Sequence, residues 1–238
     1  MLIREGRIEA IGVGLQAGGI ERLDAAGAYA SIGWIDIGVQ TGDPGFEHRE
    51  TLRTAADAAA AGGFTGIGCQ PNTEPVVDGK SEVLYVKNST RGWLVDCYPV
   101  GAVSEQCRGK DITEMIDMHR AGAVAFTDGE HPVQDSGLML RALQYVTAFD
   151  GVVINQPLNR AVAADGQLHE GFTSTSLGLK GIPALAEELM IHRDLELAAY
   201  AGARLHLANI STAGAVEQVR AAKARGQQVT CSVAALNL

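Results

Sequence analysis

Histidine, cysteine and carboxylate side chains are the residues of this sequence that could bind a metal ion or exchange protons. The four cysteines are Cys69, Cys97, Cys107 and Cys231, and they form no CxxC pair. Three of them lie in apolar, strand-like runs, which favours small buried thiols over disulfides or metal ligands. Reduced thiols are typical of a cytoplasmic protein, so we expect that compartment.

The histidines are His48, His119, His131, His169, His192 and His206. Two lie in predicted helices and three in predicted loops, where a solvated side chain is the default and a ligand role stays open. His206 lies on a predicted strand, three residues before Asn209. Because side chains alternate along a strand, we expect His206 to face the helix layer as a packed, hydrogen-bonded residue rather than a ligand.

Continuous apolar runs alternate with helical patterns along most of the chain. The predicted strands are residues 32–39, 64–69, 94–100, 123–127, 152–155, 205–210 and 228–233, and the predicted helices are 50–61, 112–120, 137–148, 182–201 and 213–225. Several helices end at glycine, as a left-handed C-terminal cap requires. Strands without polar alternation are buried on both faces, so the pattern predicts a parallel sheet covered by helices, either a (β/α) barrel or a doubly wound sheet.

Seven strands are one fewer than a closed (β/α)₈ barrel needs. The sequence stops at Leu238, just after the seventh, and open edges favour aggregation, so we expect a piece of a longer chain. We assign residues 1–31 to a small β module, which opens with two short strands around Glu5 and Gly6, and residues 32–238 to barrel strands 1 to 7.

Composition excludes several classes of partner. The net charge of −9 argues against binding to nucleic acid, which needs clustered Lys and Arg. The sequence has no apolar run of the roughly 18 residues that a membrane helix needs, and its first residues have no apolar signal-peptide core. We therefore expect neither nucleic acid nor membrane as a partner.

Five segments resemble motifs of dihydroorotases, the zinc-dependent cyclic amidohydrolases of pyrimidine synthesis. Residues 33–47 (GWIDIGVQTGDPGFE) resemble the pattern PGFIDxHVHxREPGxE, and residues 59–75 (AAAGGFTGIGCQPNTEP) resemble AAAGGFTxxxxMPNTxP. Residues 122–128 (GAVAFTD) resemble GAVAFSDD, and residues 204–212 (RLHLANIST) resemble RLHIAHVST. The fifth segment is residues 181–188. The resemblance runs in family order over nearly the whole chain and implies an amidohydrolase-type (β/α)₈ TIM barrel, here incomplete at the C-terminus.

The resemblance also implies a zinc site at the C-terminal ends of the strands, where zinc generates hydroxide from water. The family's H-x-H pair falls here on Gly38 and Gln40, and two later histidines fall on Gln156 and Asn209. A glycine and three neutral amides cannot replace imidazole ligands of zinc. The later TPHH element reads Ala-Ala-Leu-Asn at residues 234–237.

Three further positions concern the substrate and the bridging carboxylate. The arginine that binds the substrate carboxylate in the family falls on Gly42, while Asn72 matches a substrate-binding asparagine. Asp128 matches the carboxylate that bridges the metals, so it is a vestigial catalytic residue; because Gly129 follows it, a turn-capping role is an equal alternative.

The resemblance therefore implies a dihydroorotase-like protein of pyrimidine biosynthesis without zinc-dependent hydrolase activity, with no cofactor. Degenerate members of the family are structural partners of aspartate carbamoyltransferase, so we expect a structural or regulatory role beside that enzyme, and a homo-oligomer. Two alternatives stay open: an active cyclic amidohydrolase with a weak zinc site, and a sensor that binds a small molecule without chemistry.

Overall fold

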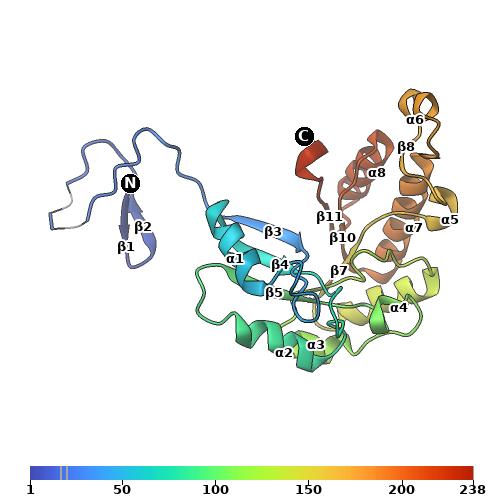
Figure 1. The fold of residues 1–238 in the computed structure, drawn as a ribbon, viewed down its shortest axis with the longest axis horizontal. Helices are drawn as coiled ribbons and strands as arrows, with labels where there is room; N and C mark the ends of the chain where they lie inside the picture. Colours follow the sequence, from blue (N-terminus) through green and yellow to red (C-terminus); the bar gives the residue numbers. More distant parts are fainter. Residues whose placement is uncertain (17, 20, 238) are drawn as a thin grey trace. The chain divides into compact units, whose positions relative to one another are not determined.

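The computed structural model describes residues 1–16, 18–19 and 21–237 (Figure 1). The chain divides into two compact units, Met1–Ile32 and Gly33–Leu238. In the first unit, strands β1 (Leu2–Arg4) and β2 (Arg7–Ala10) pair antiparallel. Glu5 and Gly6 between them both have positive φ angles, 50° and 73°, which is the geometry of a tight two-residue hairpin turn. The predicted hairpin is confirmed.

The second unit is built on one seven-stranded sheet with the order β11-β10-β7-β6-β5-β4-β3, and every neighbouring pair is parallel. The strands are β3 (Trp34–Val39), β4 (Phe64–Cys69), β5 (Asp96–Gly101), β6 (Ala125–Phe126), β7 (Val152–Asn155), β10 (Arg204–Leu207) and β11 (Val229–Cys231). All seven predicted strands are present, some of them shorter than predicted. Within the described part of the chain β3 and β11 do not pair, so the sheet is a curled, incomplete barrel.

Helices cover the outer face of this sheet (Figure 1). They are α1 (Leu52–Ala61), α2 (Lys80–Ser89), α3 (Met115–Ala121), α4 (Ser136–Thr147), α7 (Leu185–Ala201) and α8 (Ala213–Ala224). Side-chain caps begin three of them, at Thr51, Asp135 and Thr212. Helix α7 ends at Gly202 with a φ of 64°, the left-handed cap that the sequence predicts.

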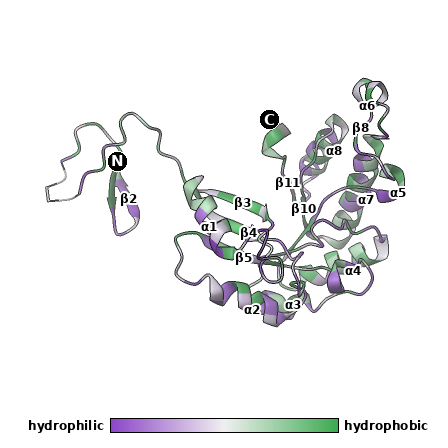
Figure 2. Cartoon of the chain, viewed as in Figure 1, coloured by the Kyte–Doolittle hydropathy of each residue, from purple (hydrophilic) through white to green (hydrophobic). Residues whose placement is uncertain are grey.

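The main core lies between the sheet and these helices. Phe126, Val153 and Leu205 face outward from β6, β7 and β10 and pack against buried residues of α4 such as Leu138 and Leu143. Figure 2 shows hydrophobic residues along β3, β4 and β5, whereas the outer helices carry both hydrophobic and hydrophilic stretches. Each helix buries its apolar face against the sheet, and this packing holds the strands, and therefore their ends, in place.

Several elements were not predicted from the sequence. Helix α2 has only two fully buried apolar residues, Val83 and Val86, so its periodicity is weak. A small excursion between β7 and α7 contains α5 (Arg160–Ala163), α6 (Phe172–Leu177) and the parallel pair β8 (Leu168–His169) and β9 (Gly181–Ile182). The predicted helix 182–201 therefore starts late, at Leu185, because Ile182 pairs as a strand.

Two short 3₁₀ turns, Glu105–Cys107 and Ala235–Asn237, complete the secondary structure. Among the described helices, none combines the length and the apolar character needed to cross a bilayer.

Candidate functional site

A pocket of about 600 Å³ extends along β3 to the C-terminal ends of the strands, and residues from most of the sequence line it. Its polar side chains come from β3 and from the ends of β4, β6, β7, β10 and β11: Asp36, Gln40, Gln70, Asn72, Thr127, Glu130, Gln156, Asn209 and Ser232. Gly38 and Gly129 also line it, as do apolar side chains such as Trp34, Ile37 and Ile154. Parallel strands bring these loops together because their carboxyl ends meet at one face. The pocket is thus the candidate site.

The four positions that correspond to family histidines all line this pocket. They are Gly38, Gln40, Gln156 and Asn209. The Gln40 Nε2 donates a hydrogen bond to the Glu130 carboxylate, and the Asn209 backbone N–H donates to Ser232 Oγ at 3.1 Å. The sequence therefore placed these residues correctly at one end of the barrel.

Asp128 is the exception, because the structure does not bring its carboxylate into the pocket. The side chain is 2% exposed and accepts hydrogen bonds from the Val103 N–H at 3.0 Å, the Ser104 N–H at 2.8 Å and the Ser104 hydroxyl. Burial raises the pKa of Asp128, and the bonds from Ser104 and Val103 oppose that rise. Asp128 thus fixes the loop after β5, and a vestigial catalytic role for it stays a prediction.

Gly129 occupies the pocket-lining position next to Asp128. The quoted pattern GAVAFSDD has a second acidic residue at that place, whereas this chain has glycine there. A Cβ built at Gly129 would lie 1.8 Å from Asn72 Oδ1. The asparagine therefore fills space that a side chain at position 129 would need.

Asn72 lines the pocket as expected, but both ends of its carboxamide are engaged. Its Nδ2 donates to the Asp128 carbonyl at 3.1 Å, and its Oδ1 accepts from the Glu130 N–H at 3.3 Å. Asn72 consequently holds the turn at residues 128–130. A role in binding substrate stays a prediction.

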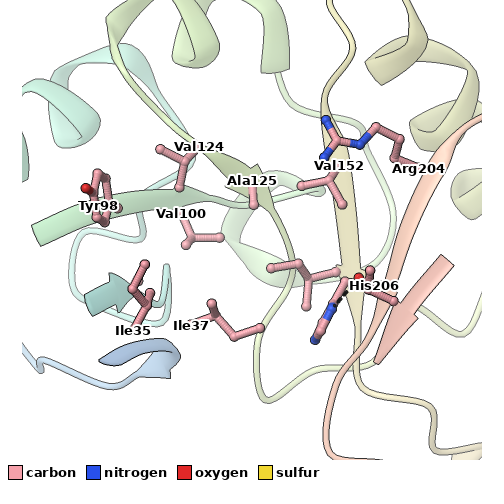
Figure 3. A pocket seen from close by; sticks show the side chains of 12 residues that line it. Ile35, Ile37, Tyr98, Val100, Val124, Ala125, Val152, Arg204 and His206 are labelled. Carbon is pink, nitrogen blue, oxygen red and sulfur yellow. Dashed lines mark hydrogen bonds between the residues drawn. The ribbon is translucent and has the colours of Figure 1, made fainter. Parts of the chain in front are cut away.

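His206 lies on the opposite face of the sheet from the one that we predicted. Leu205 and Leu207 pack into the core under the helices. His206 lines a pocket on the inner face together with Ile154, and Figure 3 shows it on the same side of the sheet as Val100. The parity count fails because the strand ends at Leu207 and Asn209 has a φ of 55°, so alternation does not continue to it.

The second half of that prediction holds, since His206 is a hydrogen-bonded residue. Its Nδ1 is 2.8 Å from Thr230 Oγ1 and its Nε2 is 3.2 Å from Ser232 Oγ. It is only 8% exposed, and burial lowers its pKa, so the neutral ring is favoured.

Among the described residues, none of the loop histidines belongs to a group of three or more side chains that could hold a metal ion. The His131 Nδ1 is 3.2 Å from the Arg160 guanidinium, which disfavours a cation at the same nitrogen. His169 lines a smaller neighbouring pocket together with Gln156, Asn209 and Glu187. The Glu187 carboxylate there accepts hydrogen bonds from the N–H groups of Ser211 and Thr212. Over the residues that the structure describes, no group of three or more His, Cys, Asp or Glu side chains is placed to hold a metal ion.

Zinc does not fit the donors of the main pocket. Its two carboxylates are Asp36, which accepts from the Gly38 N–H at 2.9 Å, and Glu130, which pairs with Gln40. The remaining oxygen donors are neutral amides and hydroxyls, and no imidazole or thiolate lines the described pocket. Zinc sites in proteins use at least three His, Cys or carboxylate ligands, so this donor set does not support one.

The position of the family arginine is also closed to a side chain. Gly42 has a φ of 66°, and a Cβ there would lie 2.9 Å from the carbonyl oxygens of both Phe46 and Glu50. Contacts at that distance require the backbone to move. The turn around Gly42 is therefore built for glycine.

Comparison with known proteins shows which family this chain resembles over its length. Residues 30–215 match the family described as Dihydro-orotase-like. The chain belongs to the dihydroorotase-like family. It is 47% identical over 234 residues to a dihydroorotase of Pelotomaculum thermopropionicum and 44% identical over 235 residues to one of Syntrophotalea carbinolica. Each match covers 98% of this chain and 55% of the relative, so the chain spans about half the length of these dihydroorotases.

The fold agrees with this assignment. A D-hydantoinase structure from Bacillus sp. AR9 superposes with a TM-score of 0.71 at 22% identity, covering 94% of this chain and 51% of that one. At this identity the likeness concerns the fold alone, and it confirms the incomplete amidohydrolase barrel.

Sequence reasoning missed two residues of the site, Gln70 and Glu130. Gln70 stands where the quoted family pattern has methionine, and its Nε2 donates to the Ile37 carbonyl at 3.2 Å. Glu130 is two residues beyond the strand motif and reaches Gln40, ninety positions earlier. Both residues are polar and follow a strand end, and that pattern could have indicated that they belong to the site.

Proposed function

We propose that this protein is a dihydroorotase homologue of pyrimidine biosynthesis without zinc-dependent hydrolase activity. One observation carries the proposal: the pocket that the strand ends create has a glycine and neutral amides at all four histidine positions. Without a metal the attacking water keeps its ordinary pKa, far above neutral pH, whereas a bound zinc ion lowers that pKa to about 7. Gly129, where the quoted pattern has an acidic residue, and Gly42, where the family has an arginine, support the same conclusion.

Metal content and turnover test this proposal together. We expect well under one zinc per chain by elemental analysis after gentle purification. The reason is that a zinc site needs at least three His, Cys or carboxylate ligands, and the pocket does not provide them. We also expect no ring opening of dihydroorotate, measured by absorbance with zinc added. Stoichiometric zinc that survives dialysis, or robust turnover, would contradict the proposal and support an active amidohydrolase with an unusual metal site.

We further propose a structural or regulatory role, with aspartate carbamoyltransferase as the partner and with self-association. What supports it is that the core under the helices is intact while the pocket has lost its chemistry: Met118, Leu138 and Leu143 are fully buried. Such a role needs a stable fold with a complementary surface. Sedimentation of the protein alone and with aspartate carbamoyltransferase from the same organism is the test, and independent sedimentation at micromolar concentrations would contradict it.

A further inference from the structure

We infer that a second pocket, on the inner face of the sheet, binds an amphiphilic carboxylate: a molecule with an apolar body and one carboxylate, such as a medium-chain fatty acid. This inner-face pocket measures about 380 Å³. It shares Ile35, Ile37 and Ile154 with the pocket at the strand ends but contains none of the four positions that correspond to family histidines. The inference is independent of the proposed function, because it requires neither the presence nor the absence of zinc.

Apolar side chains that point away from the covering helices form most of the inner-face pocket. All seven strands of the sheet contribute to it. Figure 3 shows Val100, Val124, Ala125 and Val152 between Tyr98 and Arg204. Apolar side chains of this pocket are open to solvent, since Ile35 is 61% exposed and Val124 is 48% exposed. A concave apolar surface with a few polar groups is typical of a site for a small molecule.

A single cation lies at one end of this pocket. Arg204 is the first residue of β10 and pairs in register with Val152, the first residue of β7. Its Nη1 donates to the Asp150 carbonyl at 3.1 Å and to the carboxylate of the same residue at 3.4 Å. The Asp150 side chain is 83% exposed, so this ion pair is weak. Within the described part of the chain, Nε and Nη2 of Arg204 have no acceptor, and these donors are suited to a ligand carboxylate.

The remaining lining groups favour a ligand with one negative charge. Over the residues that the structure describes, no Asp or Glu lines this pocket. His206 adds no second cation, because its ring is bound to the hydroxyls of Thr230 and Ser232 and burial lowers its pKa. The volume is close to the lower limit of about 300 Å³ for ligand pockets, which favours a small ligand. One guanidinium beside an apolar hollow therefore matches an apolar chain that ends in a carboxylate.

Two ligands of equal chain length and opposite charge test the inference. Titration calorimetry on the full chain should give a Kd for octanoate about tenfold lower, or more, than the Kd for octylammonium, since a charged hydrogen bond contributes at least that factor. The net charge of −9 attracts octylammonium, so a preference for the anion has to come from the pocket itself. Equal or tighter binding of octylammonium, or no binding of octanoate at millimolar concentration, would overturn the inference.

Three variants locate the binding. Arg204→Met keeps an apolar side chain without the charge and should weaken octanoate binding about tenfold. Ile35→Ser removes apolar surface from an exposed wall and should weaken octanoate binding about threefold or more. Arg220→Met, at an exposed arginine of α8 outside the pocket, is the matched control and should leave the affinity unchanged. An unchanged affinity for octanoate in Arg204→Met would refute the assigned carboxylate site.

Sedimentation of the same samples separates a small ligand from a protein that covers this face. We expect one octanoate per chain and a sedimentation coefficient that octanoate does not change. A dimer that binds no octanoate would assign the inner face to a second copy of the chain and would overturn the inference. Stoichiometric zinc or ring opening of dihydroorotate would overturn the proposed function and leave this inference standing.

Discussion

Replacement of Asp128 by alanine should destabilise the protein strongly, because its carboxylate is the acceptor for a buried loop. The change removes the acceptor of two backbone N–H groups and of the Ser104 hydroxyl, and Val103 and Ser104 are both fully buried. A hydrogen bond to a charged group contributes roughly 1.5–3 kcal/mol, and a buried donor without its partner costs roughly 1–3 kcal/mol. Relief of the desolvated carboxylate offsets part of the loss, so we expect a decrease of about 3–5 kcal/mol in the free energy of unfolding.

Asp128→Asn should cost much less, about 1 kcal/mol, since its amide oxygen still accepts the two backbone bonds and its amide nitrogen can donate to Ser104 Oγ. Urea unfolding followed by circular dichroism measures both changes. In thermal unfolding the alanine variant should melt roughly 6–20 °C lower, at about 2–4 °C per kcal/mol for a chain of this size. Asp165→Ala, whose side chain is 98% exposed, is the control.

The reasoning would be refuted if Asp128→Ala changed the free energy of unfolding by less than about 1 kcal/mol. That result would mean that the carboxylate is not needed to hold the loop at Val103 and Ser104.

Three further changes test other parts of the structure. Gly42→Ala should lower the free energy of unfolding by about 2 kcal/mol, because a residue in the left-handed region acquires a Cβ close to two carbonyl oxygens. Gly171→Ala is the control, since there is open space around its Cβ, and it should leave the free energy of unfolding unchanged. Equal thermal midpoints for the two variants would contradict this account. Burial lowers the pKa of His206, so the unfolded chain gains its proton first, and stability should fall as pH drops below about 6.5. His206→Asn should show a flatter stability-against-pH profile than the wild type, and an unchanged slope would contradict the burial argument. Arg193→Ala should lower the free energy of unfolding, measured in urea, by about 3–5 kcal/mol, because it leaves the fully buried carboxylate of Asp194 without its cation. Arg53→Ala breaks an exposed ion pair with Asp57 and should lower it by less than about 1 kcal/mol. Similar losses in the two variants would contradict the distinction between buried and exposed ion pairs.

Much of the barrel follows from the sequence because local patterns carry it. Runs such as Phe64–Cys69 and Val152–Asn155 are apolar without alternation, and they form central parallel strands with the predicted bounds. The convergence of Gln40, Gln156 and Asn209 also follows, since parallel strands deliver their C-terminal loops to one face. The end of helix α7 at Gly202 also follows from a local pattern, since glycine adopts the left-handed conformation of a C-terminal cap.

The sequence could not decide which way individual side chains point at strand ends. Asp128 and Gly129 are adjacent, and only the tertiary structure shows that the acid turns toward Val103 and Ser104 while the glycine faces the pocket. His206 was misplaced because a parity count requires an unbroken strand, and Asn209 lies beyond the strand in a left-handed conformation. These orientations depend on which buried donors need an acceptor, and those donors come from residues distant in the sequence.

The sequence by itself thus determined the residue types available at the pocket: a glycine and amides where the family has histidines. Only the tertiary structure shows that the side chains of Gln156 and Asn209 form no hydrogen bond within the described residues, that Gln40 donates to Glu130, and that a Cβ at Gly42 would meet two carbonyl oxygens. The residue type at each position is given directly by the sequence. Hydrogen-bond partnership and steric space arise only when segments far apart, such as residues 40 and 130, are brought into contact by the folded core.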